Sequence, residues 1–234
     1  MTEAKVAVIT GASHGIGEAL VAAYRAAGFR VVACALSIPS SSDPDVVNVA
    51  GDISDPGTAD RIMSEGVDAF GRLDTLVNNA GAYIAKPFTE YTPADSDVML
   101  STNLAGFFHI TQRALRRMEA QRSGHVLNIT ATVAEQPVNG VPAALASMAK
   151  GGLNSATKAL AIEYASRGIR VNAVSPAIIR THPEESYAGS ESQIPLGRIG
   201  TIPDVVAAVM YLENASYVTG EISHVDGGQS AGHW

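Results

Sequence analysis

The chain has 234 residues, of which 46% are hydrophobic and 17% charged, and its formal net charge is -7. This length fits one well-buried α/β domain, so residues 1–234 are expected to form a single domain without disordered tails. The negative charge argues against nucleic acid as a partner, because binding nucleic-acid phosphates requires a basic surface.

The sequence predicts no membrane span, signal peptide or internal disulfide. No apolar stretch reaches the roughly 18–20 residues that a membrane span requires. The N-terminus lacks a basic region followed by an apolar stretch and a small-residue cleavage site. The single cysteine, Cys34, lies in an apolar run, where a small buried side chain is expected. These features predict a cytoplasmic protein without membrane partners.

Short apolar runs alternate with helical patterns along the whole chain. Strands are expected at residues 5–10, 30–36, 46–50, 73–77, 125–130, 169–174 and 221–225, and helices at 18–27, 56–70, 95–121, 144–167 and 204–213. The strand segments lack polar/apolar alternation, as expected when helices cover both faces of a parallel sheet. We therefore predict an α/β fold: a single Rossmann-type, doubly wound domain with a parallel sheet of about seven strands.

Two loops are expected near the carboxyl edge of this sheet. Residues 181–198 form the longest irregular stretch and follow the sixth strand, where a substrate-covering lid is expected. Glu135, Gln136 and Asn139 lie in the loop before residue 144, either as substrate contacts or as solvated loop.

A glycine-rich turn directly follows the first expected strand. Thr10 ends the strand, and Gly11, Gly15 and Gly17 lie in the turn before an amphipathic helix. This order turns backbone N–H groups and a helix N-terminus toward one point, where they can bind a pyrophosphate. The turn therefore predicts a nucleotide ligand.

Further motifs follow at ordered positions along the chain. They are Asp52 after the third strand, Asn78-Asn79-Ala80-Gly81 after the fourth, Asn103, the run Arg170 to Pro176 and the tail Tyr217 to Gly228. With the glycine turn, this arrangement resembles the short-chain dehydrogenase/reductase family over essentially the whole chain. The resemblance implies hydride transfer between a nicotinamide coenzyme and a small carbonyl or alcohol substrate.

The resemblance also implies which residues hold the coenzyme. They are Gly11, Ser13, His14, Gly15, Ile16, Gly17, Asp52, Ile53, Asn79, Ala80, Gly81, Lys150, Pro176, Ile179 and Thr181. Ala177 stands where the family usually has glycine, a change that costs little unless the residue needs a positive φ.

The catalytic motif departs from the family pattern. In the family a tyrosine lies four residues before a lysine, on the same helix face, and a serine binds the carbonyl oxygen. Lys150 supplies the lysine, but Ala146 stands at the tyrosine position. At the serine position the chain has Ala131, or Thr132 if the loop shifts by one residue. The implied catalytic residues are therefore Lys150, Asn103 and Thr132, with an atypical proton donor.

Several groups are candidates for that proton donor. Tyr83 follows the Asn-Asn-Ala-Gly turn, and Tyr187 lies in the expected lid. Water held by Lys150 and Asn103 is a plainer alternative. The six histidines show no metal-ligand spacing, so no metal site is expected.

The second strand bears on the choice of coenzyme. It ends at Leu36 and Ser37 without a carboxylate, which removes the main barrier to the 2′-phosphate of NADP. His14 stands where NADP-using relatives often carry a basic residue. The sequence therefore favours NADP over NAD without excluding NAD.

Three functions remain open from the sequence. The first is an NAD(P)-dependent oxidoreductase, which Lys150 and the intact turn favour. The second is a coenzyme-binding sensor or scaffold without turnover, which Ala146 favours. The third is an isomerase or lyase that uses the same pocket. The resemblance also implies a homodimer or homotetramer, paired through helices 95–121 and 144–167.

Overall fold

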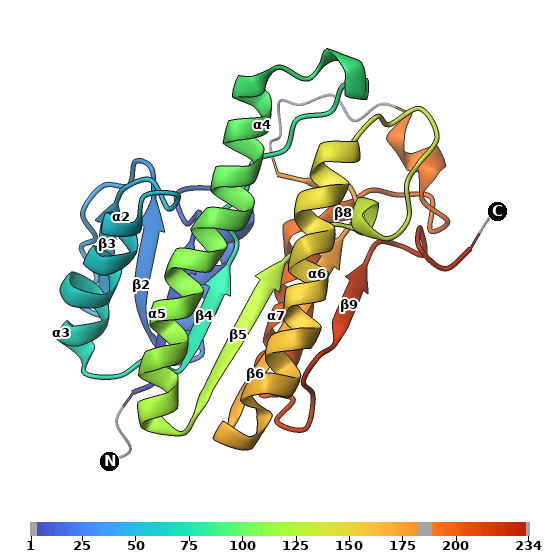
Figure 1. Ribbon diagram of the computed structural model, residues 1–234. Coiled ribbons are helices and arrows are strands. Elements are labelled where there is room, and N and C mark those ends of the chain that lie inside the picture. Colours follow the sequence, from blue (N-terminus) through green and yellow to red (C-terminus); the bar gives the residue numbers. More distant parts are fainter. Residues whose placement is uncertain (1–3, 182–188, 233–234) are drawn as a thin grey trace.

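A parallel sheet of seven strands forms the centre of the molecule (Figure 1). The computed structural model describes residues 4–181 and 189–232. Across the sheet the strands are β3 (Val46–Ala50), β2 (Arg30–Ala35), β1 (Val6–Thr10), β4 (Thr75–Asn78), β5 (Gly124–Ile129), β6 (Ile169–Pro176) and β9 (Ile222–Val225). Every neighbouring pair is parallel. The predicted doubly wound α/β domain is confirmed.

Helices cover both faces of this sheet (Figure 1). They are α1 (Gly15–Ala26) and α7 (Ile202–Asn214) on one face, and α5 (Gly106–Gln121) and α6 (Ala144–Tyr164) on the other. Along β1, Val6 and Val8 pack in the cluster that contains α5, whereas Ala7 and Ile9 pack with α1 and α7. Because both faces of the strands are buried, their sequences are apolar without alternation.

Two of the predicted helices contain a π-helical turn, which the sequence did not reveal. Residues 56–70 divide into α2 (Pro56–Arg61), a π-helical turn (Ile62–Val67) and α3 (Asp68–Phe70). The helix predicted at 95–121 begins earlier and divides into α4 (Pro93–Leu100), a π-helical turn (Ser101–Ala105) and α5. In the second turn, Asn103 Nδ2 donates to the carbonyl of Met99 at 2.8 Å, which occupies an acceptor of the preceding helical turn.

Other boundaries were also predicted imperfectly. The first helix begins at Gly15 rather than at residue 18, so the glycine turn leads directly into it. The last helix begins at Ile202, after a capping box formed by Thr201 and Asp204. The sequence missed the short elements, which are β7 (Ile179–Arg180) paired with β8 (Gly200–Thr201), and the 3₁₀ turns Phe88–Glu90, Thr132–Ala134, Ala165–Arg167 and Ser190–Gln193.

The structure describes only part of the expected lid, residues 181–198. Its residues 182–188, which include the candidate donor Tyr187, lie outside the described residues. Ser190–Gln193 form the 3₁₀ turn named above, and Ile194 is buried. Among the described helices, none is both long enough and apolar enough to span a membrane.

Candidate functional site

Two adjoining cavities open at the carboxyl edge of the sheet, where the strand order reverses between β1 and β4. Their volumes are about 510 Å³ and about 600 Å³. Both are lined by Ile16, Asn79, Gly81 and Thr181, so they meet beside the end of β4. Cavities of this size at the switch point of a doubly wound sheet are the usual place for a nucleotide.

The glycine turn between β1 and α1 lines the first cavity, and the end of β4 fixes its shape. Asn79 Nδ2 donates to the carbonyls of Thr10 and Gly11 at 2.9 and 3.0 Å. Thr10 Oγ1 accepts from the backbone N–H groups of Asn79 and Ala80. Gly11 has φ +65°, and a Cβ there would lie 2.8 Å from Ala80 Cα. The turn is therefore held in place with the α1 N-terminus at the cavity.

The other end of the first cavity is lined by residues from β2 and β3. Asp52 and Ile53 lie there with Cys34 and Leu36, as expected of an adenine-binding end. Asp52 Oδ1 accepts from the backbone N–H and the hydroxyl of Ser54. Burial raises the pKa of the Cys34 thiol to about 11, so the thiol stays protonated at neutral pH.

The second cavity is mostly apolar and contains Lys150. Lys150 Nζ donates to the carbonyl of Ile129 at 2.9 Å. Burial lowers the pKa of this ammonium group to about 8. Pro176, Ile179 and Thr181 line the same cavity as Lys150. A positive φ occurs at no described residue other than glycine and Arg122, so the alanine after Pro176 causes no backbone strain.

Gly81, Asn103 and Lys150 converge where the two cavities meet. A Cβ on Gly81 would lie 2.9 Å from Asn103 Oδ1 and 3.1 Å from Lys150 Nζ. Asn103 is 2% exposed, and its Nδ2 donates to the carbonyls of Ala82 and Met99. Its Oδ1 is buried without a hydrogen-bond partner among the described atoms. An acceptor and a cation therefore pack against Gly81, and any side chain at this position would displace them.

The Thr132 hydroxyl, expected to bind the substrate carbonyl, is instead hydrogen-bonded within the protein. Its side chain lines the cavity but is 1% exposed, and Oγ1 donates to the carbonyl of Ser175 at 3.4 Å. The neighbouring Thr130 hydroxyl likewise donates to the carbonyl of Val174. Ala131, between them, lines the cavity with a methyl group. This wall of the cavity therefore offers little hydroxyl chemistry.

Ala146 and the other candidate groups lie in different surroundings. Ala146 is 1% exposed, packs in an apolar cluster with Met99, and lines neither cavity. Tyr83 lines the second cavity and is 56% exposed, and burial of its hydroxyl raises the pKa. Glu135 instead bonds Asn154 at 2.9 Å and His224 at 2.8 Å.

Some lining residues had no signal in the sequence. The second cavity is also lined by Ala82, Val133, Val138, Val141, Gln193 and Gln229. Gln229 directly follows the tail motif, which was a usable hint, whereas Gln193 lies in a 3₁₀ turn without a motif. Within residues 4–181 and 189–232, no group of three or more His, Cys, Asp or Glu side chains is arranged to hold a metal ion.

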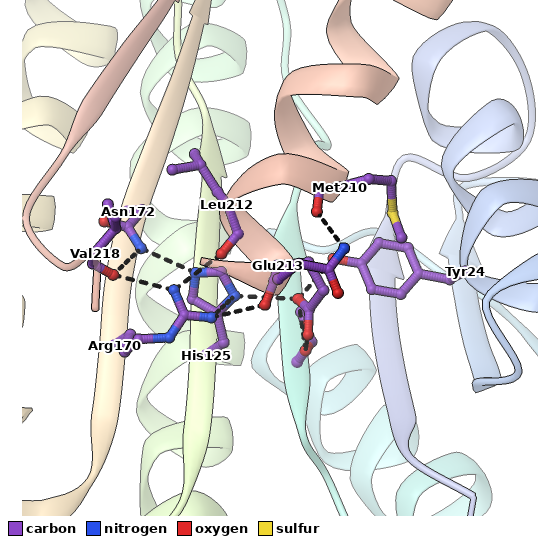
Figure 2. A network of polar contacts seen from close by, with 10 residues as sticks. Tyr24, His125, Arg170, Asn172, Met210, Leu212, Glu213 and Val218 are labelled. Atoms are coloured by element: carbon purple, nitrogen blue, oxygen red, sulfur yellow. Dashed lines mark hydrogen bonds and ion pairs between the residues drawn. The ribbon is translucent and has the colours of Figure 1, made fainter. Parts of the chain in front are cut away.

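The largest described cavity, about 700 Å³, lies at the opposite, amino edge of the sheet beside a buried polar network (Figure 2). Glu213 Oε2 accepts from Tyr24 and His125 at 3.0 and 3.1 Å, and Thr75 donates to the same carboxylate. Burial raises the pKa of Glu213, but these hydrogen bonds outweigh it and leave the pKa below its ordinary value. Arg170 donates to main-chain carbonyls at the end of α7 and beyond it.

The same network contacts both ring nitrogens of His125. Asn172 Nδ2 donates to the carbonyl of Val218, and its Oδ1 accepts from the N–H of Glu221. This amide therefore presents a donor to His125 Nε2 at 3.1 Å, so Nε2 must be the acceptor. His125 Nδ1 lies 3.1 Å from Glu213 Oε2 and 3.0 Å from the Arg170 Nη2 donor, and burial lowers the pKa of His125. Because these buried groups satisfy one another, the network serves the fold rather than a ligand.

Known proteins resemble this chain along nearly its whole length. A family model described as enoyl-(acyl carrier protein) reductase matches residues 11–230. The 3-oxoacyl-(acyl-carrier-protein) reductases FabG of Thermotoga maritima and Escherichia coli K12 are each 35% identical, over 97% of this chain and 98% and 97% of their own lengths.

Solved structures agree with these relatives. The 3-ketoacyl-(acyl-carrier-protein) reductase from Brucella melitensis complexed with NADH has a TM-score of 0.90 at 29% identity, covering 97% of this chain and 99% of that one. ElxO with NADP bound has a TM-score of 0.90 at 28% identity, covering 98% of this chain and 100% of that one.

Proposed function

The chain belongs to the short-chain dehydrogenase/reductase family of oxidoreductases, and we propose that it uses NADP, in preference to NAD, to reduce a small carbonyl compound or oxidise the matching alcohol. One observation carries the proposal: two adjoining cavities have the glycine turn at one end and Lys150 at the other. The arrangement suits a dinucleotide, whose adenosine half would fill the first cavity and whose nicotinamide end would enter the second beside Lys150.

The proposed coenzyme contacts follow the cavity walls. The turn and the α1 N-terminus would hold the pyrophosphate through backbone N–H groups; the residues are Gly11, Ser13, His14, Gly15, Ile16 and Gly17. Asp52 and Ile53 would flank the adenine, and Asn79, Ala80 and Gly81 would lie along the adenosine ribose. At the nicotinamide end the contacts would be Lys150, Pro176, Ile179 and Thr181, with Asn103 behind Gly81. A bound nicotinamide coenzyme supplies or accepts the hydride.

The preference for NADP rests on the adenosine end of the first cavity. The end of β2 contributes Ala35 and Leu36 there, so no carboxylate on this strand opposes a 2′-phosphate. His14 lines the same cavity as a group that becomes cationic when protonated. The solved relatives are described with NADP, NADPH or NADH.

We assign the proton donor of this reaction to Lys150. Its Nζ lines the cavity, and its described hydrogen bond goes to the carbonyl of Ile129. As hydride reaches the carbonyl carbon, the C=O π electrons move to oxygen, which takes a proton from the Lys150 ammonium. Water reaching the space beside Gly81 and Asn103 returns a proton to the amine. An ammonium group with a pKa of about 8 suits both steps near neutral pH.

A second candidate function is coenzyme binding without turnover. The alanines at positions 131 and 146 favour it, because the usual serine and tyrosine side chains are replaced by methyl groups. Assembly into a homodimer or homotetramer is proposed for either function. Phe108 on α5 and Ile162 on α6 are 55% and 83% exposed, on the two helices expected to pair. Sedimentation as a monomer would contradict the assembly.

The first experiment is titration of the protein with NADPH and NADH, followed by nicotinamide fluorescence. Saturable binding with tighter NADPH is the expected result. Tighter NADH would overturn the coenzyme preference. A folded protein that binds neither would exclude both the oxidoreductase and the non-catalytic coenzyme-binding function. NADPH oxidation on adding carbonyl compounds then separates these two functions.

A further inference from the structure

We propose that the substrate of this site is an uncharged carbonyl compound with an apolar body, and that carboxylate and phosphate substrates are excluded. This inference rests on the proposed oxidoreductase function and deepens it. It starts from the walls of the second cavity, which the coenzyme would fill only at the end near Lys150.

Three chain segments build the remaining walls from apolar side chains. The residues are Ala82, Tyr83 and Ala85 after β4; Val133, Val138 and Val141 after β5; and Ile178 and Ile179 after β6. Gln193 and Gln229 add two neutral amides. Such a lining gains free energy by covering apolar surface of a ligand, and its amides offer hydrogen bonds without charge.

The cavity also lacks a partner for a charged substrate. Among its described lining residues, Lys150 is the only one with a basic side chain, and none carries a carboxylate. The Lys150 ammonium already donates to Ile129 and, in the proposed reaction, serves the carbonyl oxygen. Among the described lining residues, a substrate anion would therefore find no free counter-charge, and desolvating it costs far more than desolvating an ester or ketone.

Nearby cations outside the cavity do not supply that partner. Lys86 follows the lining residue Ala85, but its Nζ pairs with Asp95 at 2.8 Å. Hydrogen bonds from Lys86 and Thr92 lower the pKa of Asp95 to about 2, so the pair persists at neutral pH. Arg180 lies between two lining residues but does not itself line the cavity.

The test uses two compounds that share one ketone and differ in charge, ethyl benzoylformate and benzoylformate. With NADPH, we expect kcat/KM for the ester to exceed that for the acid by about 30-fold or more, because an unpaired buried charge weakens binding on this scale. Equal rates, or faster reduction of the acid, would overturn the proposal.

A variant pair places a charge in the wall. Val138→Lys introduces a cation on a partly exposed loop, and Val138→Gln is the neutral control of similar length. We expect the lysine variant alone to raise kcat/KM for benzoylformate, by about tenfold, which corresponds to 1.4 kcal/mol. An equal gain in the glutamine variant would contradict the proposal, because a neutral amide would then admit the acid as well as a cation does.

A further measurement separates this inference from the proposed function. If neither compound is reduced, the reductase function fails, and calorimetry with the NADPH-loaded protein, whose nicotinamide ring is neutral, then tests the cavity alone. Ester binding at least tenfold tighter than acid binding would support the uncharged class. Equal affinities, tighter acid binding, or no binding of the ester would contradict it.

Discussion

At the amino edge of the sheet, the Glu213 carboxylate is hydrogen-bonded to three side chains, those of Tyr24, Thr75 and His125. At the carboxyl edge, Lys150 Nζ donates to one main-chain carbonyl, and Asn103 Oδ1 has no partner among the described atoms. Both edges have cavities of several hundred Å³. Unsatisfied polar groups, rather than cavity volume, therefore distinguish the edge that is prepared for a ligand.

Replacing Lys150 tests the carboxyl edge with the largest expected effect. Lys150→Met keeps the apolar stem but removes the ammonium, so kcat/KM for carbonyl reduction should fall by about 10²–10⁴. Lys158→Met, an exposed position on the same helix, is the matched control and should retain activity. Steady-state kinetics measure both. An unchanged rate in the Lys150 variant would remove Lys150 from the chemistry.

A substitution at the amino edge should lower the stability of the fold rather than the activity. Glu213→Ala leaves the buried donors of Tyr24, Thr75 and His125 without their acceptor, which should lower the free energy of unfolding by about 3 kcal/mol. For a chain of this size that corresponds to a Tm about 6–12 °C lower.

NADPH affinity of the folded Glu213 variant should stay within about twofold, which distinguishes the two edges. Glu221→Ala removes an exposed carboxylate at the same edge and should leave the Tm unchanged. If the Glu213 variant lost as much NADPH affinity as a carboxyl-edge variant, the claim that only the carboxyl edge binds the coenzyme would be wrong.

A smaller effect is expected where the two cavities meet. Gly81→Ala would place a methyl group 2.9 Å from Asn103 Oδ1 and 3.1 Å from Lys150 Nζ, closer than carbon normally approaches these atoms. The displacement should weaken NADPH binding by about tenfold, measured by fluorescence titration. Gly152→Ala on α6 meets nothing nearer than Leu104 Cδ2 at 3.5 Å and should bind NADPH normally.

The smallest effect concerns pH at the amino edge. Because burial lowers the pKa of His125, the unfolded chain binds a proton at a higher pH than the folded chain. Stability is therefore complete above about pH 6.5 and falls as the pH drops below that value toward the folded pKa. Urea midpoints at several pH values measure this fall. His125→Gln replaces the imidazole with an amide that has a donor and an acceptor but does not titrate. The urea midpoint of this variant should depend less on pH.

The sequence predicted the sheet because each strand is a short apolar run, and the glycine turn and Asn79 because their order along the chain is a motif. It missed the π-helical turn at Ser101–Ala105, whose residues continue a helical pattern. Within this turn the Asn103 side chain donates to the carbonyl of Met99, a contact that composition does not reveal. Two-residue strands such as β7 and β8 are equally invisible, because they carry no periodicity.

The amino-edge network was beyond sequence reasoning for another reason. Tyr24, Thr75, His125, Arg170 and Glu213 are far apart in the chain and form no motif, so only the folded sheet brings them together. At the carboxyl edge all the predicted cofactor residues line the two cavities, whereas Asn103, predicted as a catalytic residue, lies behind their wall. Val138 and Gln193 line the second cavity only because of how their segments fold, which no sequence motif indicates.

Cys34 gives this protein a built-in reporter. It is the only thiol in the chain, it is fully buried, and it lines the first cavity beside Asp52 and Ile53. Alkylating reagents attack thiolates, and a thiol with a pKa of about 11 supplies almost none at neutral pH while the wall stays closed. Each labelling event therefore records a transient opening of the cavity wall at β2, and slower labelling with added dinucleotide would report occupancy without any turnover.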